Sequence, residues 1–167
     1  MRFCCLSSGS EGNASVVEGG TVTPTILLLD CGLSLQELKK KLEIVGLCLS
    51  DLDGVLITHE HSDHVRGVNK LVKNTNIPLI MTHGSYIATT SIRKEKIEPI
   101  IISPHEPFNF KGLVLNPFPV PHDAREPIAI LIRDEIYKLG LLTDLGKITS
   151  HIYQMLVDID ALILEFK

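Results

Sequence analysis

Short apolar runs alternate with small-residue turns in the first part of the chain. Residues 3–6 and 14–18 flank a turn rich in serine and glycine, which predicts a hairpin of two strands. Residues 25–30 form a continuous apolar run that ends in an acid, as is typical of a strand buried on both faces. Residues 55–58 have the same character, so we predict a further buried strand there.

Helical spacing follows the run at 25–30. Ser34 and Glu37 have the spacing of a capping box, which predicts the start of a helix. Leu38 and Leu42 recur on one face, and Gly46 provides a left-handed stop. Further segments with helical periodicity are residues 65–74, 85–92 and 148–156.

The remaining apolar runs predict strands. They are residues 78–81, 97–102, 108–110, 113–118, 128–133, 136–143 and 161–164. Helices separate the buried strands, so we expect two sheets that are covered on their outer faces by helices. No helix follows the last strand, which predicts either an edge position for it or a chain that is cut short. No repeat or linker divides the chain, so one domain over residues 1–167 is expected.

Composition places the chain among compact globular domains. Its 167 residues are 44% apolar and 22% charged, which is enough to bury a core. No apolar run is long enough to cross a bilayer and residues 1–7 are too short for a signal peptide, so we predict a cytoplasmic protein without membrane contact. The cysteines include no C-x-x-C pair, which predicts reduced thiols packed as small core residues. They are Cys4, Cys5, Cys31 and Cys48.

The net charge of −4 excludes a broad positive field for a nucleic-acid backbone. A polyanion would therefore have to be recognised locally. Bound divalent cations concentrate positive charge in one cleft, so the acidic balance counts only weakly against a nuclease.

The densest polar segment directly follows the buried strand at 55–58. It places three imidazoles and a carboxylate within a few positions, namely His59, His61, Asp63 and His64. Each is a ligand that borderline divalent ions accept. In an extended segment residues i and i+2 point the same way, so His59 and His61 can reach one ion, and the following turn directs Asp63 and His64 toward a second. A loop rich in histidine by chance explains this density less well.

A metal held by two histidines needs at least one more protein ligand. His122 lies on a proline-stiffened loop after a strand, and Asp144 follows an apolar strand, where a carboxylate can bridge two cations. Both come after the dense motif in the chain, so we choose them as further ligands. The other histidines lack a partner nearby in the sequence, and we assign them no role in chemistry. They are His83, His105 and His151.

These residues carry a resemblance to a known family. The H-x-H-x-D-H signature of the metallo-β-lactamase superfamily stands intact at residues 59–64. With S-G-S-E-G-N at 8–13, P-V-P-H-D-A at 119–124 and T-D-L-G at 143–146, the chain resembles the YycJ/WalJ/VicX branch over nearly its whole length. The resemblance implies an α+β, four-layer αββα fold, incomplete at the C-terminus. It also implies a cytoplasmic, bacterial, metal-dependent hydrolase associated with exonuclease action on DNA.

The resemblance further implies how the ligands divide between two ions. One ion is bound by His59, His61 and His122, the other by Asp63 and His64, and Asp144 bridges them. Relatives continue past the strand at 161–164 and supply one more ligand histidine, which has no counterpart in this sequence. We therefore expect the first site to be the tighter one and the second to be weak or vacant.

The expected chemistry is hydrolysis. A divalent ion lowers the pKa of bound water toward about 7, and a second ion can hold the oxygens of a phosphate. Asp63 would orient that water and accept its proton. Zinc, manganese and iron all accept mixed histidine and carboxylate ligands. Backbone N–H groups of residues 8–13 either line the cleft or belong to an ordinary hairpin turn.

Three functions are compatible with these residues. The first is a metal-dependent phosphodiesterase acting on DNA, because two cations suit an anionic phosphodiester. The second is hydrolysis of a small thioester or lactam, since fold and ligands do not determine the substrate. The third is a catalytically silent metal-binding domain that forms a homo-oligomer through its open strand edge.

Overall fold

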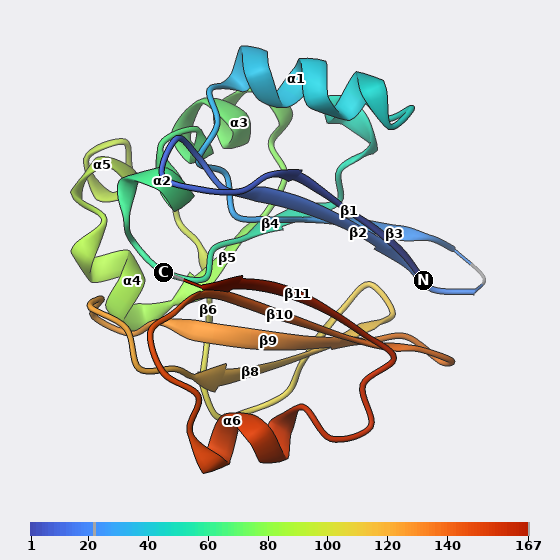
Figure 1. The fold of residues 1–167 in the computed structure, drawn as a ribbon. Coiled ribbons are helices and arrows are strands. Elements are labelled where there is room, and N and C mark those ends of the chain that lie inside the picture. The colour runs from blue at the N-terminus through green and yellow to red at the C-terminus, as the bar shows by residue number, and fades with distance from the viewer. Residues whose placement is uncertain (22, 167) are drawn as a thin grey trace.

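Two sheets face each other, and helices cover their outer faces (Figure 1). The structure, a computed structural model, describes residues 1–21 and 23–166. Within these residues the first sheet has the strand order β1-β2-β3-β4-β5-β6, and the second has the order β11-β10-β9-β8-β7. This layering confirms the predicted α+β fold of two sheets between helices.

The first sheet is antiparallel at one edge and parallel through the rest. β1, β2 and β3 pair in antiparallel fashion, and β3 to β6 run parallel. β4 and β5 are buried along their whole length because helices cover one face and the second sheet covers the other. The bounds are β1 Arg2–Ser7, β2 Ala14–Gly19, β3 Thr25–Leu29, β4 Gly54–Leu56, β5 Leu79–Thr82 and β6 Ile100–Ile102.

The second sheet is antiparallel except at one edge. There β11 runs parallel to β10, and α6 (Ser150–Met155) connects the two strands across the outer face (Figure 1). β9 and β10 form an antiparallel hairpin, in which Arg133 lies opposite Lys138. The bounds are β7 Phe108–Phe110, β8 Leu113–Pro119, β9 Ile128–Arg133, β10 Lys138–Leu145 and β11 Ala161–Phe166.

α1 and α3 lie over the outer face of the first sheet, and α4 and α5 lie toward one end of it (Figure 1). α1 begins as predicted, because the Ser34 hydroxyl accepts a hydrogen bond from the Glu37 N–H and the Glu37 carboxylate accepts one from the Ser34 N–H. Leu38 and Leu42 bury its inner face. The bounds are α1 Leu35–Ile44, the 3₁₀ turn η1 Leu49–Asp51, α2 Ser62–Val65, α3 Val68–Thr75, α4 His83–Ala88 and α5 Thr90–Lys94.

The helix predicted over residues 65–74 is present as α3, but it begins at Val68, because a break separates it from α2. α2 and α3 are separate because the backbone between them bonds to other segments. The Gly67 N–H donates to the Cys31 carbonyl over 2.8 Å, and the Asp63 carbonyl accepts from the Asn13 N–H over 2.7 Å. In a continuous helix Gly67 would instead donate to Asp63.

Two further boundaries differ from the prediction. Residues 85–92 form two helices that meet at Thr89, whose hydroxyl donates to the Ser85 carbonyl and whose backbone (φ −84°, ψ 86°) leaves the helical region. β6 is shorter than the predicted strand at 97–102. The reason is that the Ile97 N–H donates to the Ile92 carbonyl and so belongs to the end of α5.

The thiols are free, as predicted, but only one of them is fully packed. Burial, with a contribution from Asp30, raises the pKa of the Cys31 thiol to about 12. Cys4 is half-buried, and Cys5 and Cys48 are exposed, so the prediction of core packing was wrong for these two. Cys5 lies on an edge strand, and Cys48 precedes η1, where its N–H donates to Asp51.

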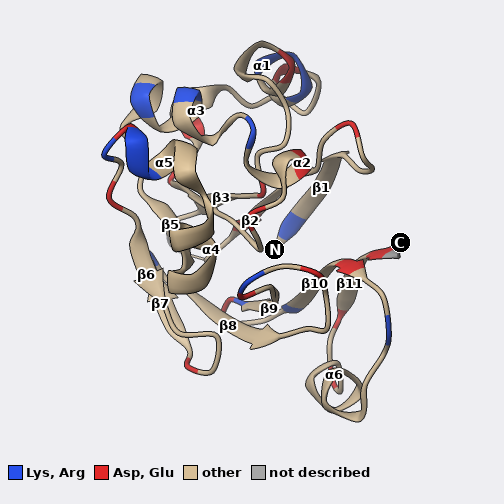
Figure 2. Ribbon diagram, turned by 90° about the vertical axis from the view of Figure 1, so that its left-hand side faces the viewer, with Lys and Arg blue, Asp and Glu red and all other residues tan. Residues whose placement is uncertain are grey.

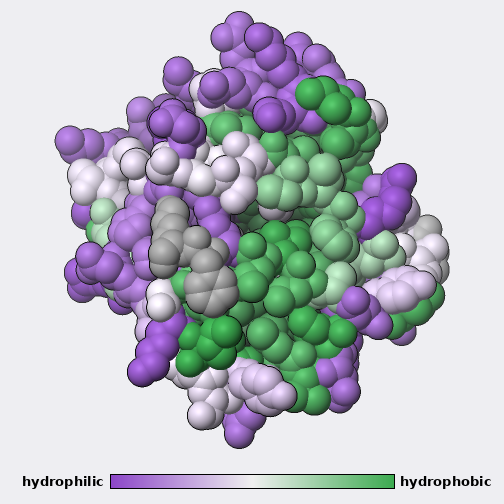
Figure 3. Space-filling model, viewed as in Figure 1, coloured by the Kyte–Doolittle hydropathy of each residue, from purple (hydrophilic) through white to green (hydrophobic). Residues whose placement is uncertain are grey.

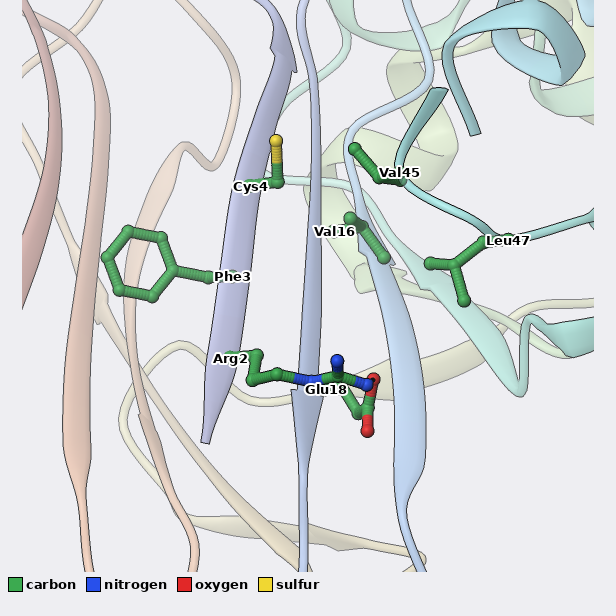
Figure 4. Close-up of a pocket in the computed structure, with 7 residues that line it drawn as sticks. All are labelled: Arg2, Phe3, Cys4, Val16, Glu18, Val45 and Leu47. Atoms are coloured by element: carbon green, nitrogen blue, oxygen red, sulfur yellow. Dashed lines mark hydrogen bonds and ion pairs between the residues drawn. The ribbon is translucent and has the colours of Figure 1, made fainter. Parts of the chain in front are cut away.

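β1 and β11 are the edges of their sheets and face the same side of the molecule (Figure 1). Apolar side chains gather on this side (Figure 3), where Phe3, Leu162 and Leu164 are exposed. On the other face of β1 a groove is lined by Val16 and Leu47, and Phe3 points away from it (Figure 4). None of the helices in residues 1–21 and 23–166 has the length and apolar character that crossing a membrane requires.

Candidate metal centre

The polar residues singled out in the sequence lie at one end of the two sheets. His59 and His61 follow β4, and α2 carries Asp63 and His64. From the second sheet come His122, on the loop after β8, and Asp144, near the end of β10. The two sheets therefore supply facing halves of a single cluster.

The first ligand group consists of His59, His61, His122 and Asp144, whose ligand atoms all lie within 4.8 Å of one another. His61 Nδ1 is 3.2 Å from both His59 Nε2 and His122 Nε2. His59 Nε2 is 3.2 Å from Asp144 Oδ2. Three imidazole nitrogens and one carboxylate oxygen thus converge, as a four-coordinate divalent ion requires.

The second ligand group consists of Asp63, His64 and Asp144. His64 Nε2 is 2.7 Å from Asp144 Oδ2 and 3.8 Å from Asp63 Oδ2. Asp144 belongs to both groups and is 1% exposed, so its carboxylate has the position of a bridge.

Asp144 reaches the cluster through an irregular strand. Its φ of +53° is unusual for a residue with a side chain, and the pairing of β10 with β11 shifts register between Leu142 and Leu145. A bulge of this kind redirects a side chain that regular pleating would point elsewhere. β10 therefore continues past Asp144, whereas the sequence prediction ended the strand before it.

Asp30 supports the second group, and its role was missed in the sequence. Its Oδ2 accepts a hydrogen bond from His64 Nδ1 over 2.8 Å, and its Oδ1 accepts from the Thr58 N–H over 2.8 Å. A proton held on Nδ1 leaves the lone pair of His64 Nε2 for an ion. The only signal in the sequence was the acid that ends an apolar run.

Thr58 and two glutamates hold the first group. The Thr58 hydroxyl lies 3.1 Å from His59 Nδ1, which leaves His59 Nε2 facing the cluster. The loop that carries His122 is tied down by Glu60, which accepts from the Arg125 N–H, and by Glu126, which accepts from the N–H of Gly84 in α4. These supports also went unrecognised in the sequence.

The charges of the cluster favour a bound cation. Burial, then the positive charge of His64, lowers the pKa of His59 to about 3, so its imidazole is neutral and able to bind a metal. Burial also lowers the pKa of His64, but Asp30 and then Asp144 and Asp63 outweigh it and raise that pKa to about 8. Carboxylates thus stabilise positive charge beside neutral imidazole ligands. This mixed donor set fits divalent cations.

The remaining histidines lie outside both groups in the described residues. His83, His105 and His151 are exposed, and the ring of His151 lies edge-on to Phe118. The 8–13 turn, by contrast, does reach the cluster, because Asn13 Nδ2 is 3.0 Å from His64 Nε2.

This geometry agrees with comparisons to known proteins. Residues 25–167 match the family described as Beta-lactamase superfamily domain. The chain belongs to this superfamily. This chain is similar in structure to the metallo-β-lactamase fold protein YhfI from Bacillus subtilis, with a TM-score of 0.74 at 15% identity. The matched region covers 96% of this chain and 68% of the YhfI chain. The predicted metallo-β-lactamase fold is thereby confirmed.

Two named relatives match this chain over nearly its whole length. It is 29% identical over 99% of its length to Exodeoxyribonuclease YycJ of Bacillus anthracis. It is 27% identical over 99% of its length to Exodeoxyribonuclease WalJ of Streptococcus pneumoniae. The chain spans 62% of the length of each of these relatives. The predicted resemblance to the YycJ/WalJ branch is therefore confirmed.

Proposed function

We propose that this protein is a metal-dependent hydrolase that removes nucleotides from an end of DNA. The observation that carries the proposal is the convergence of the first and second ligand groups on the shared carboxylate of Asp144. The similarity of the chain to two exodeoxyribonucleases supports DNA as the substrate.

The two ligand groups would hold two divalent ions, of which zinc, manganese and iron all suit the donors. Bound ions supply Lewis acidity, which lowers the pKa of water toward about 7, and positive charge for phosphoryl oxygens. Asp63, whose side chain is 15% exposed, faces both solvent and His64, so its Oδ2 accepts the proton of the attacking water. His64 keeps its orientation through Asp30.

The first group offers more donors than the second, so we expect it to bind its ion more tightly. Metal titration tests this expectation, because two equally tight ions would require a ligand beyond those named.

The side of the molecule seen in Figure 2 carries basic residues on α3 and α5, which would contact the DNA backbone despite the net charge of −4. They are Lys70, Lys73, Arg93 and Lys94. The cytoplasmic location expected from the sequence stays a prediction.

Digestion of end-labelled linear DNA with added manganese or zinc tests the activity. The parent chain should shorten the linear DNA and leave closed circular DNA intact. His61→Ala should abolish shortening, and the matched variant His105→Ala, which changes an exposed histidine outside both groups, should retain it. Shortening that survives His61→Ala would show a contaminating nuclease. Hydrolysis of a small thioester with DNA left intact would contradict the proposed substrate and favour a small-molecule hydrolase.

A second copy of the chain is the proposed partner at the apolar side formed by β1 and β11. Edge strands with exposed Phe3, Leu162 and Leu164 are surfaces that pairing with another strand would bury. Light scattering after size exclusion should give twice the mass of one chain, and Leu164→Lys should return it to one. A parent chain that elutes with the mass of a single copy would contradict this partner.

A further inference from the structure

The 8–13 turn is bound to the second ligand group through its backbone. The Asn13 N–H donates to the Asp63 carbonyl over 2.7 Å, and the Asn13 carbonyl accepts from the Gly32 N–H over 2.9 Å. Arg66 completes the connection, since its guanidinium donates to the carbonyls of both Glu11 and Gly32. Three segments far apart in sequence therefore meet at Asp63.

Two glycines permit this close approach. A Cβ on Gly32 would lie 1.6 Å from the Asp63 carbonyl oxygen, a distance that no side chain tolerates. A Cβ on Gly12, whose φ is +147°, would lie 2.7 Å from the Gly32 carbonyl oxygen. The backbone of the turn is thus shaped to bring Asn13 against Asp63, which an ordinary surface hairpin would not need.

The side chain of Asn13 is held in one orientation. It is buried, and its Oδ1 accepts a hydrogen bond from the Gly9 N–H over 2.8 Å. That bond assigns the other end of the amide as the NH₂ group. Nδ2 then faces the second group, 3.0 Å from His64 Nε2 and 3.4 Å from Asp63 Oδ2. In the metal-free protein the NH₂ group thus lies beside two side chains of the second group, those of His64 and Asp63.

We propose that Asn13 is a positioning residue, which orients Asp63 and His64 for a divalent ion without itself binding that ion. The second group has only three donors among the described residues, so the orientation of each one weighs heavily on affinity. Partners that orient metal ligands typically change affinity about 10- to 100-fold when removed. The inference rests on the proposed function, because it requires the two-ion centre.

Manganese titration of the metal-free chain, followed by calorimetry and by counting bound ions, tests the inference. His61→Ala and His64→Ala assign the binding steps to the first and second groups. Asn13→Ala should weaken binding at the second group about 10- to 100-fold and leave the first group unchanged. Ser10→Ala, an exposed change in the same turn, should leave both steps as in the parent. Thermal unfolding of each metal-free variant checks that it folds.

Asn13→Asp provides an effect of opposite sign. It keeps the acceptor for the Gly9 N–H but places an anion beside His64, so it should tighten binding at the second group on the order of tenfold. If Asn13 only stabilised the turn, Asn13→Asp would bind both ions with the affinities of the parent. Asn13→Ala would then weaken both binding steps to the same extent. Either result overturns the inference, as does a parent that binds a single ion. A parent that binds no ion defeats the proposed function itself.

Discussion

The two ligand groups differ in how the protein holds them. The first group is built mainly from histidines of two loops, and its supports, Thr58, Glu60 and Glu126, lie close to the ligands or on one neighbouring loop. The second group is built on the short helix α2 and depends on Asn13, in the turn before β2, and on Asp30, directly after β3. The first group thus has four donors, whereas the second has three donors whose orientation depends on Asp30 and Asn13. Disturbing those supports should therefore harm the second group selectively.

Asp144→Ala should have the largest effect, because Asp144 is the residue that both groups share. Its loss removes a donor from each group and leaves His59 and His64 without their nearest carboxylate. We expect metal content after dialysis to fall from that of the parent to near zero and DNA shortening to stop. Elemental analysis beside the digestion assay measures both. Asp123→Ala, an exposed change next to His122, is the control, and one tightly held ion in Asp144→Ala would show that the groups are independent.

Gly32→Ala should cause the next largest effect, now on stability. The added methyl group would meet the Asp63 carbonyl, so the three joined segments must separate, at a cost of about 3 kcal/mol. Gly46→Ala is the matched change at the end of α1, where φ is +78° but nothing lies within 4 Å of the new atom. It should cost only about 1 kcal/mol. Urea unfolding of the metal-free variants compares the two, and equal losses would refute the role given to Gly32.

This contrast also explains what could be predicted from the sequence. The strands follow from apolar runs, and the start of α1 follows from a capping box, because both signals are local. His59 and His61 stand out because several ligand types crowd into one segment. Asp30 and Asn13 went unassigned because their partner His64 lies 34 and 51 positions away. A hydrogen bond between such distant residues leaves no periodicity in the chain.

The break between α2 and α3, at the start of the helix predicted over residues 65–74, escaped prediction for the same reason. Apolar spacing predicts a helix there, but Gly67 and Asp63 bond to Cys31 and Asn13 instead of to each other. Tertiary hydrogen bonds thus override a local pattern at the place where the ligands must be presented.

Asp30→Asn should have a smaller and more selective effect than Asp144→Ala. The amide keeps the size of the side chain but replaces the carboxylate that accepts from His64 Nδ1 and from Thr58. We expect binding at the second group to weaken about 10- to 100-fold. The first group should change much less, because in the described residues Asp30 contacts His59 through the Thr58 hydroxyl and not by a direct hydrogen bond. Manganese titration measures both steps, and equal weakening of the two would remove the distinction between the groups.

Asp134→Asn tests whether general stability, rather than local support, controls the second group. Asp134 lies at the far end of β1 from the turn and pairs with the Met1 amino group over 3.3 Å. Burial raises the pKa of its carboxyl, but the N–H groups of Tyr137, Ile136 and Gly20, with the amino group, outweigh this and lower it to about 2. The asparagine variant should lose about 1–2 kcal/mol at neutral pH.

The dependence of that loss of stability on pH follows from the direction of the pKa shift of Asp134. A carboxyl whose pKa is lowered on folding stabilises the protein above its ordinary value of 3.8. The stabilisation disappears as the pH falls through about 2. Urea unfolding should therefore show a gap between Asp134→Asn and the parent that is full above pH 3.8 and closes in stronger acid, while manganese binding at neutral pH stays unchanged. If binding at the second group also weakened in Asp134→Asn, loss of general stability would explain the effects of the Asn13 and Asp30 variants. Asn13 and Asp30 would then not be selective supports of the second group.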